Sequence, residues 1–134
     1  MLKFRHLMTP RTVLRAMDRV TVRALFRNAA RLRLIARRSI RKRKRKNSLP
    51  GNPPFTRTGK KGRNPLRRAI VFEVNRAAKR AIIGPRASVV GQVGELHEFG
   101  GTRGGLRFPA RPFMGPALDK IRDDLPMAWR STMV

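Results

Sequence analysis

An excess of positive charge is the feature that most constrains how this chain can fold. Its 134 residues include 33 Lys and Arg against 7 Asp and Glu, which gives a formal net charge of +26 at neutral pH. Charges of one sign repel one another in a compact state, and this repulsion is strongest at low salt. We therefore expect a polyanion or an acidic partner surface to neutralise part of the charge.

The length of the chain allows one modest hydrophobic core, so we predict a single domain over residues 1–134. The hydrophobic fraction is 40%, with only 6% aromatic residues, which is thin for a chain of this charge and favours stabilisation by neighbouring subunits. The absence of Cys excludes a disulfide framework and a thiolate metal site. A homo-oligomer is the expected state.

Nothing in the sequence predicts a membrane partner. No apolar run approaches the roughly 20 residues needed to cross a bilayer, and Met1 to Met8 lacks the long apolar region of a secretory signal. An Arg-rich, acid-poor start is also typical of organellar transit peptides, but the helical pattern continues far beyond a presequence. We expect a soluble protein that is not exported by that route.

A long N-terminal helix is predicted to begin at Pro10, with Thr9 as its cap, because Pro is tolerated at the first helical position. Apolar residues then recur at helical spacing. They are Val13, Met17, Val20, Ala24, Leu25, Leu32 and Ile35. The following segment, 37–46, has Lys or Arg at every position except Ser39 and Ile40, and such a density of like charges predicts an exposed basic arm or helix extension.

The remainder of the chain predicts short elements. The Pro- and Gly-rich stretch 48–65 reads as a long loop, and residues 69–74 and 81–83 as two strands of a hairpin that Gly84-Pro85 closes. Helical spacing predicts a short helix over 89–99, a turn over 100–105, an extended segment over 106–113 and a C-terminal helix from Pro116 with Asp119 in its first turn. We predict an α+β fold in which a small, mainly antiparallel sheet carries the short helix and the C-terminal helix.

Catalysis has little support in the sequence. The acids show no metal-ligand spacing and no recognisable pairing with His, and the glycines do not form a phosphate-binding loop. His97 beside Glu98 is the nearest to a catalytic couple, but neighbouring side chains diverge on a helix or strand. We expect no enzyme activity, no cofactor and no metal.

The basic run has three readings: an arm that binds nucleic acid, a patch that docks on an acidic protein ring, or a solvated tether. Its densest part is Arg41, Lys42, Arg43, Lys44, Arg45 and Lys46. Contact with DNA through these residues would be insensitive to base sequence, because Lys and Arg without a recognition helix read phosphates. The Phe residues are scattered singly, so a base-stacking platform has no support.

Three stretches, in order, resemble the tailed-phage family of tail-completion, or virion morphogenesis, neck proteins. The first is Pro50-Gly51-Asn52-Pro53-Pro54 with Thr58-Gly59 and Leu66-Arg67. The second is His97-Glu98-Phe99-Gly100-Gly101. The third, and the most specific, is Pro109-Ala110-Arg111-Pro112-Phe113-Met114-Gly115-Pro116-Ala117-Leu118. The resemblance covers about residues 48–134, and the basic run and the insertion 60–65 depart from the family pattern.

The motifs also have a physical interpretation. Gly100 permits a left-handed helix stop, Phe99 and Phe113 are expected to anchor helix against sheet, and Pro112 keeps the chain extended. Arg111 is a candidate for a bidentate bond to an acid such as Glu98. The residues expected to determine the fold or an interface are Glu98, Phe99, Gly100, Pro109, Arg111, Pro112 and Phe113.

The resemblance implies a structural virion protein of the neck, assembled in the host cytoplasm. It would form a ring of six copies between a connector or stopper ring and the tail-tube protein, with genomic DNA passing through its channel. Two alternatives stay open: a ribosomal or nucleoid type of RNA- or DNA-binding protein, which the composition alone favours, and a tail-tube or other minor tail component.

Overall fold

A computed structural model of the chain describes residues 10–57 and 65–133. Helices and short strands alternate along it, so the predicted α+β class is confirmed. The helices are α1 (Pro10–Ser39), α2 (Pro65–Ala69), α3 (Ala87–Val90), α4 (Val93–Phe99), α5 (Met114–Ile121) and α6 (Met127–Met133), and a 3-10 turn, η2, covers Arg122–Asp124. The strands are β1 (Arg41–Lys42), β2 (Phe55–Thr56), β3 (Ile70–Asn75), β4 (Arg80–Pro85), β5 (Gly101–Arg103) and β6 (Leu106–Phe108).

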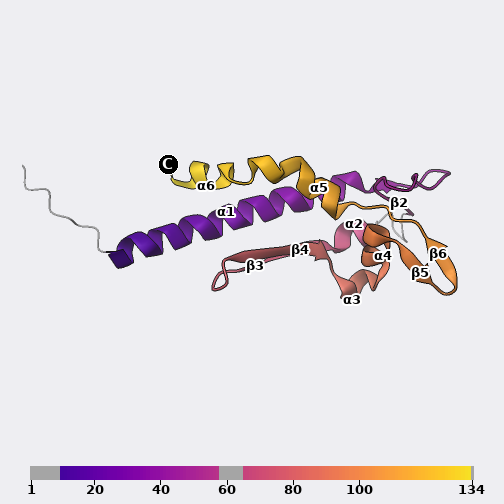
Figure 1. The fold of residues 1–134 in the computed structure, drawn as a ribbon, viewed down its shortest axis with the longest axis horizontal. Coiled ribbons are helices and arrows are strands. Elements are labelled where there is room, and N and C mark those ends of the chain that lie inside the picture. The colour runs from indigo at the N-terminus through magenta and orange to yellow at the C-terminus, as the bar shows by residue number, and fades with distance from the viewer. Residues whose placement is uncertain (1–9, 58–64, 134) are drawn as a thin grey trace, which may run out of the picture.

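Helix α1 runs along the length of the molecule, with α5 and α6 on one side of it and the β3–β4 hairpin on the other (Figure 1). It begins at Pro10, as predicted, because this residue has no N–H to leave unpaired. The predicted cap, Thr9, lies outside the described residues. The apolar stripe is confirmed in part: Ala24 and Leu32 are buried, whereas Val13 and Met17 are exposed at the N-terminal end of the helix.

The strands form three separate two-stranded pairs, which corrects the prediction of one small sheet. Strands β3 and β4 are antiparallel from Ile70↔Pro85 to Asn75↔Arg80, and β5 and β6 form a second antiparallel hairpin. Gly84-Pro85 therefore belongs to β4 and does not close the hairpin. The turn covers 76–79, where Asn75 Oδ1 accepts the N–H of Ala78 at 2.8 Å.

The core lies between the C-terminal part of α1, the start of the hairpin and α5. It contains Leu32, Ala36, Ile40, Leu66, Ile70, Phe113, Ala117 and Ile121. Each Å² of apolar surface that is removed from water stabilises a fold by about 25 cal/mol. The core fixes α5 against α1, and α1 also packs along α6 and both strands of the β3–β4 hairpin.

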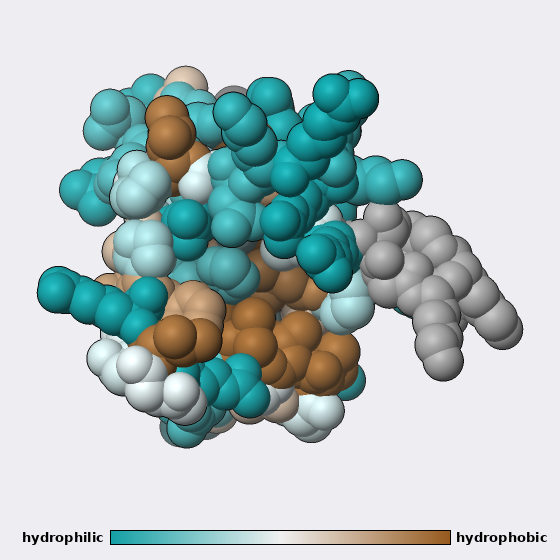
Figure 2. Space-filling view, turned by 90° about the vertical axis from the view of Figure 1, so that its right-hand side faces the viewer, coloured by the Kyte–Doolittle hydropathy of each residue, from teal (hydrophilic) through white to brown (hydrophobic). Residues whose placement is uncertain are grey.

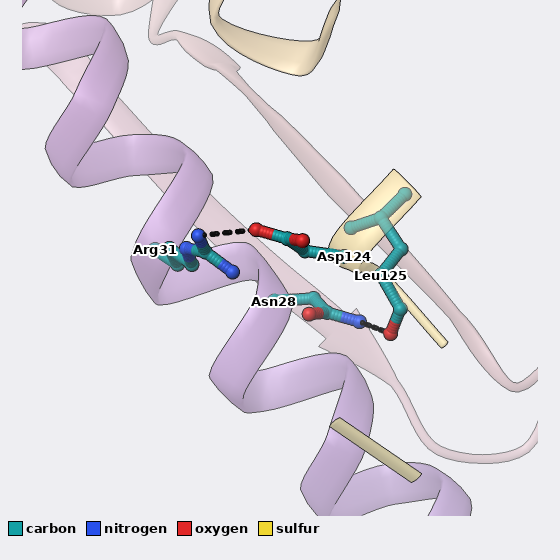
Figure 3. A network of polar contacts seen from close by, with 4 residues as sticks. All are labelled: Asn28, Arg31, Asp124 and Leu125. Atoms are coloured by element: carbon teal, nitrogen blue, oxygen red, sulfur yellow. Dashed lines mark hydrogen bonds and ion pairs between the residues drawn. The ribbon is translucent and has the colours of Figure 1, made fainter. Parts of the chain in front are cut away.

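Polar contacts continue this attachment of the C-terminal segment to α1 (Figure 3). The amide of Asn28 donates to the carbonyl of Leu125 at 3.0 Å, and Arg31 forms a 2.7 Å ion pair with Asp124. The predicted C-terminal helix over the sheet is corrected to a pair of helices along α1, interrupted at η2 and Pro126 because Pro cannot continue the hydrogen-bond ladder.

Other boundaries also differ from the prediction: β2 lies within the predicted loop over 48–65, and β5 lies within the predicted turn over 100–105. The helix expected over 89–99 is divided into α3 and α4 at Gly91, whose φ of 57° is left-handed. Helix α5 begins at Met114, before Pro116, and Asp119 is not in its first turn. The negative group at its N-terminus comes from another part of the chain.

Candidate functional site

Parts of the three motif stretches meet at one place in the structure, which we call the motif junction (residues 48–51, 97–100 and 110–115); Leu66 and Arg67 belong to α2, and Thr58-Gly59 lies outside the described residues. The N–H of Arg111 donates to the carbonyl of His97 at 2.6 Å, and the N–H of Gly51 donates to the carbonyl of Ala110 at 2.8 Å. Arg111 Nε donates to the carbonyl of Ser48 at 2.9 Å. The third segment is therefore held by both of the others.

Glu98 supplies the negative group at the start of α5. Its Oε2 accepts the N–H groups of Phe113 and Met114, both at 2.9 Å, and its Oε1 accepts the N–H of Gly115 at 2.8 Å. The first N–H groups of a helix have no partner within the helix, and a carboxylate there also meets the positive end of the helix dipole. Glu98 is thus a helix cap contributed by α4, which sequence spacing alone did not reveal.

The predicted bond between Arg111 and Glu98 is wrong. Both oxygens of Glu98 bind backbone N–H groups of α5, and the guanidinium of Arg111 binds the loop at Ser48. Backbone donors that are fixed in direction offer a carboxylate three contacts at once, whereas Arg111 can satisfy its Nε with a nearby carbonyl. Glu98 and Arg111 therefore each join two segments of the chain, but through different partners.

Gly100 ends α4 with a φ of 71°, so the predicted glycine stop with positive φ is confirmed. A Cβ at this position would lie 2.9 Å from the carbonyl oxygen of Phe108 and 2.9 Å from the N–H nitrogen of Ala110. Both contacts are with backbone atoms, which cannot move aside as a flexible side chain can. Close approach of the third segment therefore requires Gly here.

The two aromatic residues of the motifs have opposite surroundings. Phe113 is 0% exposed in the core, and its predicted role as an anchor is confirmed. Phe99 is 77% exposed, so its predicted role as an anchor between helix and sheet is wrong. It is the last residue of α4, where the chain turns out toward the β5–β6 hairpin. Pro109 and Pro112 lie in the extended segment that leads to α5.

An apolar face occupies the same end of the molecule; we define it by Phe99, Leu106 and Phe108. Leu106 is 67% exposed and Phe108 is 37% exposed. They are two positions apart on β6, so their side chains project from one face of the hairpin. Viewed from this end, apolar residues gather over the lower half and hydrophilic residues over the upper half (Figure 2).

The basic run begins as an extension of α1 over 37–39, which was one of the two predictions for 37–46, but it is not exposed throughout. Ile40 is 1% exposed in the core, and Arg37 donates to the carbonyls of Ile70 and Arg68. Burial, followed by repulsion from neighbouring arginines, lowers the pKa of Arg37. The chain then leaves the core as β1, which pairs in parallel with β2.

The predicted contact residues Arg41, Lys42, Arg43, Lys44, Arg45 and Lys46 follow Ile40 directly. All are exposed except Arg43, which is half-buried and whose N–H donates to the carbonyl of Thr56 at 2.9 Å. The pairing of β1 with β2 therefore fixes the start of the basic segment 41–46 to residues 55 and 56 of the Pro- and Gly-rich loop. Residues 58–64 of that loop, which hold Thr58-Gly59 and most of the insertion, lie outside the described residues.

Several acids have structural partners. Asp18 pairs with Lys79 at 2.6 Å, Asp119 with Arg122 at 2.9 Å, and Asp124 with Arg31. Within residues 10–57 and 65–133, no group of three His, Asp or Glu is placed to hold a metal ion. Burial, together with repulsion from Arg111, lowers the pKa of His97. No helix in the described part of the chain is long and apolar enough to span a membrane.

Sequence reasoning missed Lys120, Asn47, Asn52 and Ser48, which line a hollow beside the basic segment together with Arg41. Asn47 and Ser48 directly follow the basic run, and this adjacency was the one available signal. Lys120 comes from α5 and is brought there only by tertiary packing.

Comparisons with protein-family models, with curated proteins and with solved structures found no match to this chain.

Proposed function

We propose that this protein is a structural subunit of a tailed-phage neck, which forms a ring that completes the tail and joins it to the head connector. The observation that carries the proposal is the motif junction. Parts of the three stretches that resemble the neck family lie together: Glu98 of the second caps the start of α5 in the third, and the N–H of Gly51 in the first donates to Ala110 of the third. The resemblance therefore concerns one structural unit and not three unrelated turns.

The apolar face supports assembly with further copies of the chain. Large apolar side chains that gather at one end of a small protein are typical of interaction sites. Strands β5 and β6 pair with each other and with no other described strand, so the outer edge of each is open to a neighbour. Ring closure needs a heterologous contact, in which this face meets a different surface of the next copy.

The high charge also fits a position between other components. Acidic surfaces of a connector or tail-tube ring, or the DNA that passes through the neck, would offset the repulsion among +26 formal charges. A location in the virion is part of this proposal. In solution, the same repulsion opposes self-association at low salt, so assembly must be tested where the charge is screened.

The test is the mass of the purified protein by native mass spectrometry in about 0.5 M ammonium acetate, where the Debye length is below about 5 Å. The proposal predicts a discrete closed ring, alone or when the adjacent neck proteins are added. Leu106→Ser in the apolar face should reduce ring formation. Leu14→Ser is the matched control, because Leu14 is 60% exposed and lies on α1 at the opposite end of the molecule (Figure 1).

A chain that remains a monomer with all neck components present would contradict the proposal. If that monomer also bound any RNA or DNA with a steep salt dependence, the nucleic-acid-binding alternative would replace it. Open polymers with many copies per particle would favour a tail-tube component.

A further inference from the structure

A hollow of about 500 Å³ opens between the end of α1, the Pro- and Gly-rich loop and α5. We call it the basic hollow. It is lined by Ser39, Arg41, Asn47, Ser48, Leu49, Asn52, Pro53, Phe55 and Lys120. No Asp or Glu is among these lining residues, so the local charge comes from the two cations.

The cations of the hollow have no partner of their own. Neither the guanidinium of Arg41 nor the ammonium of Lys120 forms a hydrogen bond or ion pair with a described residue, whereas the side chains of Arg31, Lys79 and Arg122 each pair with an acid. The two side chains belong to different elements, β1 and α5. Two unpaired cations that converge on one hollow attract an anion more strongly than either does alone.

Neutral donors complete the lining. Asn47 and Asn52 bring amide groups, and each amide offers two N–H donors. Ser48 is 5% exposed, and its hydroxyl is buried without a hydrogen-bond partner in the described structure. A buried hydroxyl that is left unpaired is costly, by about 1 to 3 kcal/mol. A small shift of the loop at Ser48 would let this hydroxyl donate to an oxygen of an anion bound in the hollow.

From this arrangement we propose that the basic hollow binds a phosphodiester group of a nucleic-acid backbone. Arg41 and Lys120 neutralise the phosphate, and the Asn amides donate to its oxygens. The basic segment 41–46 leaves the rim of the hollow and is exposed except at Arg43, so a nucleic-acid strand with a phosphate in the hollow continues across Lys42, Lys44 and Arg45. A polyanion with regularly spaced charges matches this continuation better than a single carboxylate does.

The proposal does not depend on ring assembly, because every group in the hollow belongs to one copy of the chain. It also predicts binding without base preference, since phosphate contacts carry no sequence information. It differs from attraction by net charge alone, because it assigns the binding to two particular cations and not to the sum of all basic residues.

The experiment measures the affinity of a fluorescein-labelled 20-bp DNA by anisotropy over a series of salt concentrations, with the full-length protein. The double variant Arg41→Gln/Lys120→Gln removes both cations of the hollow. Each phosphate contact contributes a slope of about 0.9 in log affinity against log salt, which is about eightfold in affinity at 0.1 M salt. The double variant should therefore bind about 60-fold more weakly, with a slope reduced by about 1.8.

The matched control is Arg11→Gln/Arg15→Gln, which removes the same charge from exposed positions at the other end of α1. It should weaken binding less than threefold and leave the salt slope unchanged. Equal losses in the two double variants would overturn the proposal, because they would show an effect of net charge only. Circular dichroism should give the same melting curve for both variants, whose substituted side chains are exposed.

Two competitors distinguish the source of the anion. Inorganic phosphate, compared with chloride at equal ionic strength, should displace DNA from the wild type and not from the hollow variant. A poly-glutamate peptide should compete no better than its ionic strength accounts for. If the peptide bound through Arg41 and Lys120 while DNA affinity was insensitive to them, the hollow would be a docking site for acidic protein and the proposal would fail.

Discussion

Replacement of Glu98 by Ala tests the motif junction most directly. The carboxylate accepts three backbone N–H groups at the start of α5, and the bonds to Phe113 and Met114 are part-buried, whereas the bond to Gly115 is exposed. A hydrogen bond to a charged group contributes about 1.5 to 3 kcal/mol when water cannot replace it. With about 1.5 kcal/mol for each of the two part-buried bonds and none for the exposed bond, Glu98→Ala should lower the free energy of unfolding by about 3 kcal/mol.

The loss is measured by urea denaturation followed by circular dichroism, where a two-state transition gives the free energy of unfolding directly. For a domain of this size it corresponds to a fall in melting temperature of about 12 °C. Glu98→Gln keeps one oxygen acceptor and places an NH₂ group where the other oxygen was, so it should lose about half as much. This intermediate value distinguishes a cap from simple loss of side-chain volume.

Glu95→Ala is the matched control, because Glu95 lies on the same helix and is exposed, and its carboxylate forms no hydrogen bond or ion pair with a described residue. Its removal should change stability by no more than about 0.5 kcal/mol, the value of a favourable helix-dipole contact. A Glu98→Ala protein within 0.5 kcal/mol of the wild type would refute the cap. Equal losses for both substitutions would attribute the effect to α4 itself and not to its contact with α5.

Two further predictions concern residues of the same region. Phe113→Ala should destabilise the protein by about 3 to 5 kcal/mol because the side chain of Phe113 is 0% exposed. Phe99 is 77% exposed, so Phe99→Ala should change the free energy of unfolding of the monomer by less than about 0.5 kcal/mol. Similar losses for the two variants in urea denaturation would contradict the assigned burial. Burial lowers the pKa of His97, so its ring resonances should titrate by NMR below the ordinary value of about 6.5. The unfolded chain then binds more protons than the folded one between the two pKa values, and His97 makes stability fall as the pH falls from about 6.5 through its folded pKa. A titration midpoint at or above 6.5 would contradict this environment.

Local sequence patterns predicted those features of the fold that are set by residues close together in the chain. Pro10 marked the start of α1 because its backbone has no N–H to satisfy, and the β-branched and aromatic run from Ile70 to Val74 formed β3 as expected. Gly100 was recognised as a helix stop because only Gly accepts its positive φ without strain. In each case the signal and the structure lie within a few residues of each other.

The tertiary contacts of those elements could not be predicted from local patterns. Phe99 and Phe113 look alike as aromatic residues beside Gly and Pro, yet one is exposed and the other fills the core. Which of them is buried depends on where α5 meets α1. The strands likewise were predicted individually, but only the structure shows that they form three separate pairs, with α1 packed along β3–β4 (Figure 1).

The sequence by itself determined the charge, the α+β class, the long N-terminal helix, the strands β3 and β4 and the glycine stop, because each of these depends on composition or on contacts between close neighbours. Only the tertiary structure decided that Glu98 caps α5, that Arg111 binds Ser48, and that Lys120 faces the same hollow as Arg41. The physical reason is distance along the chain. A carboxylate or a cation accepts any suitable partner that folding brings within reach, and its spacing in the sequence does not specify which one.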